Sequence, residues 1–284
     1  MRINHNISSM IGQTSLGVQQ TSLSKSLEKL STGLRINRAS DDAAGLSVSE
    51  TMRSRIRGMD RAKSNAEDGI ALVQIAEGAS GEINNILQRM RELAIQSSTD
   101  TMTTTERSYT NKEFGQLMSE ITRIASSASY NGMTLLDGAS GSFGVSGGSS
   151  SVLHIGAGSS ATTDRLSITV NSMTLGAIGL NATSTSVSTA TTALAALSLI
   201  DTAIKSVNTM RSDMGAYVNR LEFAISNLSN QVYNTQDAES RIRDVDFAKE
   251  TTEFTRAQIL TQSATSMLAQ ANQVPQGVLG LLAH

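Results

Sequence analysis

Apolar residues recur at steps of three and four along the first part of the chain. From Leu16 this seam runs through Leu23, Leu27, Leu30 and Leu34, and Ile3, Ile7 and Met10 precede it at similar spacing. Such steps place side chains on one face of an α-helix, so the pattern predicts a helix with a coiled-coil-like face. The polar segment 35–45, which closes on a glycine, interrupts the pattern and is interpreted as a linker or helix junction.

The helical pattern resumes at Leu46 and continues to Ala94. A Thr-rich turn at 99–105 follows, and then a shorter amphipathic stretch with Phe114 and Ile121 on one side. The pattern therefore predicts one long and one shorter helix.

The strongest periodicity lies between residues 200 and 232. Its ten positions are Ile200, Ile204, Val207, Arg211, Met214, Val218, Leu221, Ile225, Leu228 and Val232, of which only Arg211 is polar. A helix of about 44 residues here would be about 65 Å long. Because such a helix cannot bury its seam alone, we expect the amino-terminal helices to lie beside it.

A last seam, at the same spacing, runs to the end of the chain. Its positions are Leu260, Ala264, Met267, Ala271, Val274, Val278 and Leu281. Pro275 is expected to kink or locally break this helix. The terminal helix could fold back on its own core, but both terminal seams extend beyond the paired middle helices. Association with other copies of the chain is the more economical way to bury them.

The centre differs from the rest of the chain, because only Asp137, Asp164 and Arg165 are charged between 137 and 192. Apolar residues alternate with polar ones around Leu153 and again around Leu166, which predicts a small β-hairpin. Residues 139–151 favour a flexible linker. The predicted fold class is mainly α: long terminal coiled-coil helices, a helical rod and a small β-hairpin region.

Composition excludes several functions. With 23 basic and 25 acidic residues interspersed, the chain has no general field for nucleic acid or an anionic membrane, and we expect neither as a partner. The chain contains no uninterrupted apolar run of about 18 residues, so no membrane-spanning helix is predicted. The absence of cysteine excludes disulfides, thiolate catalysis and Cys-ligated metals. The amino terminus lacks the features of a cleaved secretory signal, so the protein either stays in the cytoplasm or leaves by another route.

Motifs for catalysis are missing as well: there is no H-E-x-x-H, G-x-S-x-G, P-loop or dinucleotide fingerprint. Asp41 and Asp42 could act as an acid–base or metal pair, but helix capping explains adjacent carboxylates here more simply. The SRIRDVD segment at 240–246 could clamp a phosphate, although its alternating signs favour ion pairs. We predict no catalytic residues, no metal and no cofactor.

Several long motifs occupy the two ends of the chain. They are MRINHNI (1–7), LEKLSTGLRINRASDDAAGLSVSETMRSRIRGM (27–59), LQRMRELAIQ (87–96), YNGMTLLDG (130–138), GAYVNRLEFAISNL (215–228), AESRIRDVDFAKE (238–250) and QILTQSATSMLAQANQVPQGVLGLL (258–282). In this order the motifs resemble those of bacterial flagellins. With the helical sequence between them they cover roughly the first 138 and last 95 residues. The end, Leu282-Ala283-His284, departs from the many relatives that stop at an arginine.

The resemblance implies a self-assembling structural subunit of the flagellar filament that serves motility, without catalysis. It implies an inner coiled-coil domain (1–44 and 236–284), a helical rod domain (45–136 and 190–235) and a variable region (137–189). The inner-seam positions expected to drive assembly are Ile3, Ile7, Leu23, Leu27, Leu30, Leu34, Leu260, Ala264, Met267, Leu268, Ala271, Val274, Val278 and Leu281.

Partners follow from the same resemblance. They are other copies of the chain, an export chaperone on the carboxy-terminal helix at 258–282, and hook-associated and cap proteins. A vertebrate innate flagellin receptor would read positions that match Arg89, Leu93 and Glu113. Export as an unfolded chain by the flagellar type III apparatus is implied, into a filament that is external or enclosed in a periplasm. A hook-associated or junction protein is the alternative function, and an enzyme with a site in the centre is a weaker one.

Overall fold

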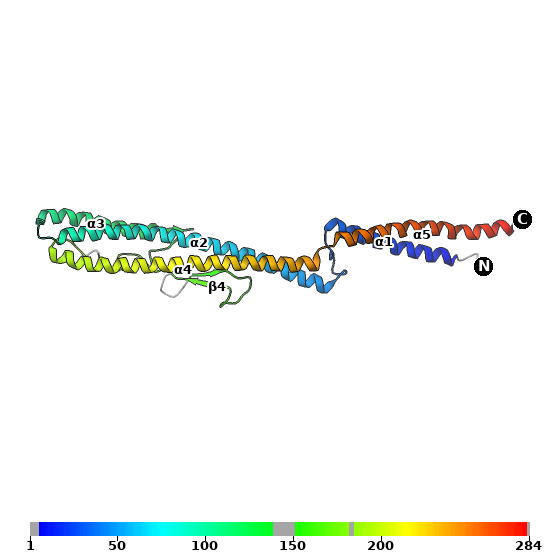
Figure 1. The fold of residues 1–284 in the computed structure, drawn as a ribbon, viewed down its shortest axis with the longest axis horizontal. Coiled ribbons are helices and arrows are strands. Elements are labelled where there is room, and N and C mark those ends of the chain that lie inside the picture. The colour runs from blue at the N-terminus through cyan, green and yellow to red at the C-terminus, as the bar shows by residue number, and fades with distance from the viewer. Residues whose placement is uncertain (1–5, 139–150, 182–184, 283–284) are drawn as a thin grey trace. The chain divides into compact units, whose positions relative to one another are not determined.

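The structure is a computed structural model that describes residues 6–138, 151–181 and 185–282, with side chains described as far as residue 273. Its five helices are α1 (Ile7–Thr32), α2 (Ala43–Ser98), α3 (Thr104–Ser127), α4 (Ala190–Arg243) and α5 (Phe247–Leu282) (Figure 1). Two antiparallel hairpins accompany them: β1 (Ser129–Tyr130) pairs with β2 (Met133–Thr134), and β3 (Ser151–His154) pairs with β4 (Arg165–Ile168). The mainly helical fold with a small β-hairpin, expected from periodicity, is confirmed.

The chain divides into two compact units. Unit 1 comprises Met1–Ser54 and Asn234–His284, and unit 2 comprises Arg55–Tyr233. The division therefore falls inside α2 and α4, which each contribute residues to both units.

The main hydrophobic core of unit 2 lies between α2, α3 and α4, and a smaller cluster of Ile56, Met59, Ala62 and Leu228 adds to it. Ile83, Leu87 and Met90 of α2 meet Phe114 of α3 there, and each of these side chains is fully buried. Half of the predicted seam of α4 is confirmed, because its residues at heptad spacing, Ile200, Val207, Met214, Leu221 and Leu228, are all buried. The other five positions, Ile204, Arg211, Val218, Ile225 and Val232, are half-buried, and Ala203 and Met210 are buried although the seam did not include them. Few aromatic side chains are needed because aliphatic residues and methionine fill the space between helices.

The β3–β4 hairpin packs on the side of α2. The Asn65 side-chain amide donates to the His154 carbonyl at 3.0 Å. Gly69 allows the close approach, since a Cβ there would lie 2.4 Å from a methyl carbon of Leu153. On β4, Leu166 and Ile168 are buried in the core of unit 2. The linker expected at 139–151 lies outside the described residues except for Ser151, which begins β3.

The β1–β2 hairpin turns through Asn131 and Gly132, both with positive φ (49° and 78°). Two consecutive positive φ values are the geometry of the two-residue hairpin turn that Asn-Gly favours. This hairpin was not predicted from the hydrophobic periodicity, although the Asn-Gly pair at 131–132 is typical of such a turn.

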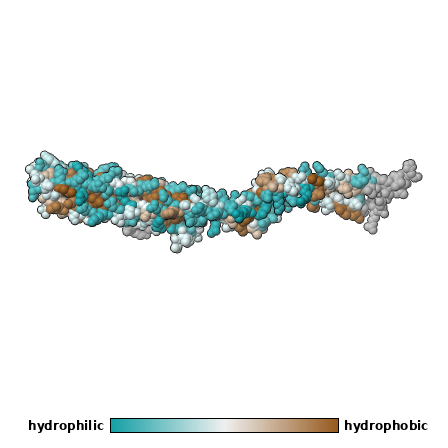
Figure 2. Space-filling model, viewed as in Figure 1, coloured by the Kyte–Doolittle hydropathy of each residue, from teal (hydrophilic) through white to brown (hydrophobic). Residues whose placement is uncertain are grey.

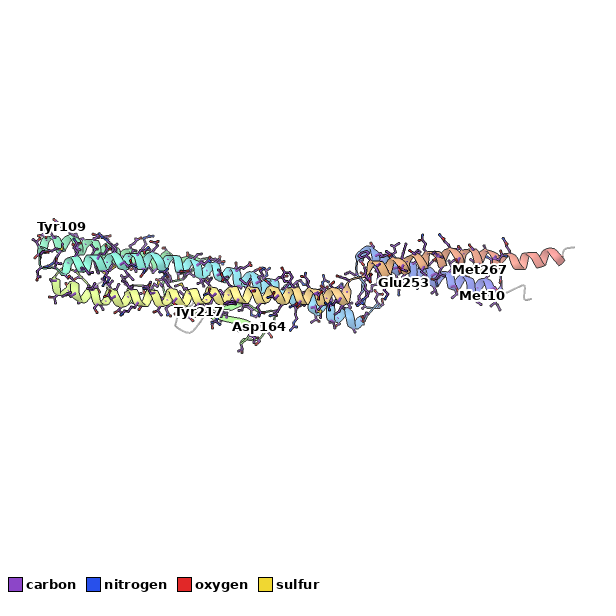
Figure 3. All side chains as sticks on the ribbon, in the orientation of Figure 1. Met10, Tyr109, Asp164, Tyr217, Glu253 and Met267 are labelled. Carbon is purple, nitrogen blue, oxygen red and sulfur yellow. The ribbon has the colours of Figure 1, made fainter. Side chains whose placement is uncertain are left out.

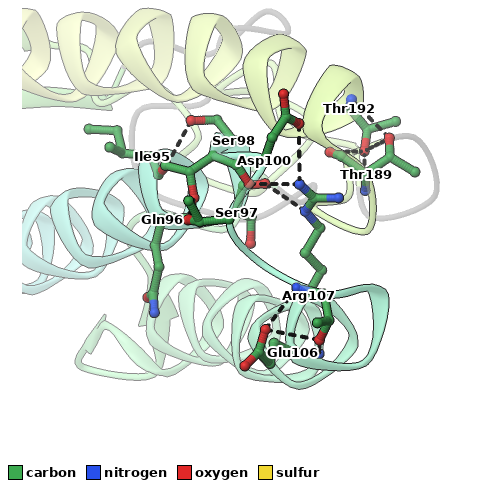
Figure 4. A network of polar contacts seen from close by, with 12 residues as sticks. Ile95, Gln96, Ser97, Ser98, Asp100, Glu106, Arg107, Thr189 and Thr192 are labelled. Atoms are coloured by element: carbon green, nitrogen blue, oxygen red, sulfur yellow. Dashed lines mark hydrogen bonds and ion pairs between the residues drawn. The ribbon is translucent and has the colours of Figure 1, made fainter.

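Side chains satisfy the helix ends at the turn between α2 and α3. Thr103 and Glu106 form a reciprocal capping box at the start of α3. The pKa of the Glu106 carboxyl is lowered because it accepts hydrogen bonds from the Thr103 backbone N–H and hydroxyl. The Arg107 guanidinium donates to the carbonyls of Ser97 (3.1 Å) and Thr99 (2.7 Å), which belong to the end of α2 and the residue after it (Figure 4).

The linker that precedes α2 is anchored by its two aspartates. Asp41 accepts from the backbone N–H groups of Asn37 and Arg38, which lowers its pKa, and Asp42 accepts from the N–H of Gly45 at 2.9 Å. The Asp42 contact agrees with the predicted capping at the start of α2, whereas Asp41 stabilises the preceding turn of the linker instead.

One apolar stretch of α4 is long enough and hydrophobic enough to span a membrane by length and composition, the single such stretch in the described part of the chain. Its side chains at Ala193, Ala196, Ile200 and Ala203 are buried in the unit 2 core. Packing between helices therefore accounts for one face of this stretch, whereas Leu194 and Leu199 are exposed.

Candidate assembly surface

Helices α1 and α5 lie side by side in unit 1 and run in opposite directions (Figure 1). Near one end, the Asn6 side-chain amide donates to the Ala271 carbonyl at 2.9 Å. Near the other, the Lys29 ammonium lies 3.8 Å from the Glu250 carboxylate. Between these two contacts the residue numbers rise along α1 and fall along α5. The two helices therefore form an antiparallel pair, called the α1–α5 pair below.

The two linkers at one end of the pair also bond to each other. The Arg35 N–H donates to the Arg243 carbonyl (2.6 Å), and the Val245 N–H donates to the Gly33 carbonyl (3.0 Å). Leu34 and Asp244 thus form an isolated antiparallel bridge. Gly33 is left-handed (φ 74°) and ends α1, which turns the chain toward this bridge.

The contact face of the α1–α5 pair contains part of the predicted inner seam. Leu23, Leu30 and Leu34 are half-buried, as are Ala264, Leu268 and Ala271. A Cβ added at Gly12 would lie 3.2 Å from a methyl carbon of Leu268, so the helix axes approach closely there. Among the described residues of this face, only Ser26 (7% exposed) and Ala257 (5% exposed) are buried.

The rest of the described inner seam points away from the partner helix. The exposed fraction is 57% for Ile7, 55% for Leu27, 43% for Leu260 and 68% for Met267. Ile3, Val274, Val278 and Leu281 lie outside the residues whose side chains the structure describes.

Four more exposed apolar residues join these positions. Met10 and Ile11 on α1 are about three-fifths exposed, as is Val18, and Ile259 on α5 is 57% exposed. The Met10 and Met267 side chains stand out from the pair in Figure 3, and Figure 2 shows apolar residues at the surface of this unit. Ile11, Val18 and Ile259 were not predicted. On α1 they could have been found from a second apolar stripe that begins at Ile7 and Ile11. This stripe is less clear in the sequence because threonines occupy its positions 14 and 21.

These exposed side chains define the candidate assembly surface: Ile7, Met10, Ile11, Val18 and Leu27 on α1, and Ile259, Leu260 and Met267 on α5. Thr14, Gly17 and Thr21 form a shallow groove beside Val18, because small side chains leave room on this side of α1. Burying apolar area stabilises an assembly by about 25 cal/mol per Å². The surface is therefore suited to packing against other helices.

The two arginines of 240–246 form ion pairs within unit 1. The two aspartates of this segment instead accept hydrogen bonds, Asp244 from the Ser240 hydroxyl and Asp246 from the Ala248 N–H. Arg243 lies 2.6 Å and Arg53 lies 3.0 Å from the same carboxylate oxygen of Glu50, and Arg241 lies 2.9 Å from Asp237. The two guanidinium groups hold the pKa of the Glu50 carboxyl below its usual range. For the two arginines, the geometry agrees with the ion-pair interpretation of this segment.

The three positions predicted for a receptor separate in the structure. Arg89 and Glu113 form an exposed ion pair on α2 and α3, with 2.9 Å between a guanidinium nitrogen and a carboxylate oxygen. Glu92 also pairs with Arg89 at 3.0 Å, and both carboxylates raise the pKa of that guanidinium. Leu93 is 2% exposed and belongs to the core beneath them.

In the described part of the chain, no group of three or more His, Asp or Glu side chains is placed to hold a metal ion. Apolar stripes and ion pairs are the main exposed features of the described residues, and both are suited to contacts between helices.

Comparisons with known proteins give a consistent result. Residues 3–140 match the model of the bacterial flagellin N-terminal helical region, and residues 197–282 match that of the C-terminal helical region. The chain is 45% identical to the flagellar filament 33 kDa core protein of Treponema phagedenis over 291 residues, covering 99% of this chain and 100% of that protein. It is 46% identical to a flagellin of Halalkalibacterium halodurans over 282 residues, with the same coverage.

One solved structure shares the fold. It comes from Vibrio parahaemolyticus, carries a provisional assignment as a flagellar hook-associated protein, and superposes with a TM-score of 0.58 at 16% identity. The match covers 72% of this chain and 100% of that one.

Proposed function

The chain belongs to the bacterial flagellin family and is a structural subunit of the flagellar filament, not an enzyme, and we propose that its candidate assembly surface forms the inner contacts of that filament. The observation that carries the proposal is the set of large apolar side chains left exposed on the α1–α5 pair. Monomeric proteins rarely expose contiguous apolar patches above a few hundred Å². Neighbouring copies that cover this surface would supply the burial that one chain lacks.

The size of the effect follows from the exposed fractions. Fully burying a Leu, Ile or Met side chain stabilises by about 1.5–3 kcal/mol. Met267 and Ile259 are more than half exposed, so covering each in an assembly contributes about 1 kcal/mol or more. An aspartate at such a position would instead bury a carboxylate, which costs several kcal/mol unless a partner neutralises it.

The roles proposed for the parts of the chain follow the domains expected from the family. Residues 1–44 and 236–284 act as the inner coiled-coil domain, 45–136 and 190–235 as the rod, and 137–189 as the short variable region. The packing of α2, α3 and α4 into one core supports a rod role for the middle segments.

Further partners are proposed on the same basis. An export chaperone would cover the exposed Ile259, Leu260 and Met267 on α5 until the subunit reaches the filament. Hook-associated and cap proteins would contact the ends of the assembly. Secretion without a cleaved signal, through the flagellar type III apparatus, would deliver the chain to an external or a periplasmic filament.

A contact with the vertebrate innate flagellin receptor is proposed at the exposed Arg89–Glu113 pair. Leu93 would support this surface from below, because its side chain is buried in the subunit. A charge change at Arg89 would then weaken binding, whereas a smaller side chain at Leu93 would act through the fold.

Seeded polymerisation of the full chain tests the assembly proposal. Met267→Asp places a charge on the candidate assembly surface, and Gln262→Asp, at an exposed polar position of the same helix, is the matched control. We expect the critical concentration for filament growth, measured by sedimentation and electron microscopy, to rise at least tenfold for Met267→Asp and less than twofold for Gln262→Asp. Equal growth of the two variants would refute the surface. Rings or caps in place of filaments from the unaltered chain would favour the junction-protein alternative.

A further inference from the structure

The contact face of the α1–α5 pair repeats itself every seven residues on both helices. On α1 the half-buried leucines are Leu16, Leu23 and Leu30, and on α5 the alanines Ala257, Ala264 and Ala271 follow one another at the same interval. A slip of one helix by seven residues, about 10.5 Å, would therefore place similar side chains opposite one another. Apolar packing alone therefore specifies the register of this pair weakly. The Leu34–Asp244 bridge and the Lys29–Glu250 contact constrain it at the linker end, and the opposite end needs a polar contact of its own.

Pro275 removes one backbone hydrogen bond from α5, and the carbonyl that is left without a donor can specify the register. Proline has no amide hydrogen, so the carbonyl four residues earlier, that of Ala271, has no helical donor. Nevertheless α5 is assigned as one helix from Phe247 to Leu282, and the local break expected at Pro275 is not found in the described backbone. A break is avoidable when another donor satisfies the free carbonyl.

Asn6 supplies that donor from the other helix. Its side-chain amide donates to the Ala271 carbonyl at 2.9 Å, while its side-chain oxygen accepts from the Ser9 N–H at 3.2 Å as the N-cap of α1. Asn6 thus caps the start of α1 and also supplies the hydrogen bond that the Ala271 carbonyl of α5 lacks. Ser9 adds a second contact, since its hydroxyl donates to the side-chain oxygen of Asn272 at 2.8 Å.

We propose that Asn6 and Pro275 together form a register lock, in which the carbonyl freed by Pro275 accepts the Asn6 amide and selects one alignment of α1 on α5. Within the body of α5 only the Ala271 carbonyl is freed in this way, because the chain contains a single proline. A slip of seven residues would leave that carbonyl without its donor and place Asn6 against a carbonyl already bonded in the helix. The lock rests on the proposed function in one respect: it sets how the α1 and α5 parts of the candidate assembly surface line up.

Disulfide reporters in the full, monomeric chain test the lock, and the absence of native cysteine makes them specific. Gly12→Cys with Leu268→Cys reports the observed register, since a Cβ at Gly12 lies 4.0 Å from the Leu268 Cα. Gly12→Cys with Thr261→Cys reports the register slipped by one heptad. Asn6→Asp keeps the capping acceptor and removes the donor, Asn6→Ser keeps a neutral cap but is too short to reach, and Pro275→Ala restores the missing N–H.

Loss of one hydrogen bond shifts such an equilibrium by roughly fivefold. We expect Asn6→Asp and Asn6→Ser each to lower the ratio of observed-register to slipped-register disulfide by roughly that factor. In the Pro275→Ala background the change should fall below twofold, because the restored amide bonds the same carbonyl.

Three results would overturn the lock: an unchanged ratio, a change of equal size with and without the Pro275→Ala substitution, or a change in Asn6→Asp alone, which would indicate charge repulsion. Failure of the parent reporter to form the 12–268 disulfide would overturn it too. Filament growth is measured separately, so a chain that keeps its register but does not polymerise would refute the proposed function and leave the lock intact.

Discussion

Arg211 is the one polar residue in the ten-position seam of α4, and its replacement by methionine should stabilise unit 2. The Nε of Arg211 is buried and has no hydrogen-bond partner among the described residues. Its terminal nitrogen lies 3.8 Å from the Glu77 carboxylate, and the two side chains are 37% and 42% exposed. The residue therefore combines an unsatisfied buried donor with a long, solvent-exposed ion pair.

The two contributions have different sizes. A buried donor without a partner costs about 1–3 kcal/mol, whereas an exposed ion pair contributes about 0–1 kcal/mol. Arg211→Met removes the donor, keeps an unbranched apolar stem and completes the seam. We expect a net stabilisation of about 1 kcal/mol, which raises the melting temperature of a unit of this size by about 2–4 °C.

Urea unfolding followed by circular dichroism at 222 nm measures the effect, with thermal unfolding as the second readout. Glu77→Gln is the matched control, since it removes the ion pair and leaves the buried Nε in place; we expect it to change stability by less than about 0.5 kcal/mol. A lower urea midpoint for Arg211→Met would contradict the reasoning. It would mean that the Glu77 contact outweighs the buried donor.

Three further predictions concern single positions. Phe114→Ala removes a fully buried ring from the unit 2 core and should cost about 3–5 kcal/mol in urea unfolding, whereas Tyr109→Ala on the same helix, 64% exposed, should change stability little. Gly132→Ala puts a Cβ on a residue with φ 78° and should destabilise by about 1 kcal/mol in the same assay, while Gly115→Ala, in α3 with no atom within 4 Å of the added Cβ, should not destabilise. The folded-state pKa of Glu50 is lowered from its ordinary value of 4.5, so the stability that it contributes is complete above that value and is lost as pH falls through the lower folded pKa. Helicity measured from pH 6 to pH 3 should therefore fall less steeply in Glu50→Gln than in the unaltered chain, and identical titrations would show that the Arg243 contact does not stabilise unit 1.

The sequence predicted the long helices well because each carries a seam that one face must bury. In α4 the positions at heptad spacing from Ile200 to Leu228 are all buried, and so are Ala203 and Met210, which the predicted seam did not include. Of the adjacent carboxylates at 41 and 42, Asp42 was correctly interpreted as a cap of the following helix, since capping requires only neighbouring backbone, whereas Asp41 bonds to the linker that precedes it. Local chemistry and strong periodicity are the features that a single sequence reveals most directly.

The orientation of α1 and α5 could not be predicted in the same way. α1 carries two apolar stripes, one through Leu16, Leu23 and Leu30 and the other through Ile7, Ile11 and Val18. Both satisfy the helical period, and which stripe meets α5 depends on contacts such as that of Asn6 with Ala271, far away in sequence. For the same reason Leu93, which matches a receptor position by motif, proved to be a core residue.

The division of apolar residues between the two faces of the α1–α5 pair affects how stable this pair is in a single chain. Its contact face contains leucines that are only half-buried, alanines and a glycine, and few polar contacts hold it, so the pair is weakly stabilised within one chain. The larger apolar side chains, such as Ile11 and Met267, are turned outward, where only neighbouring copies would cover them. If the proposed inner contacts form, this pair gains most of its apolar burial from neighbouring copies. Its stability would then depend on the assembled state, because one chain alone leaves these side chains exposed.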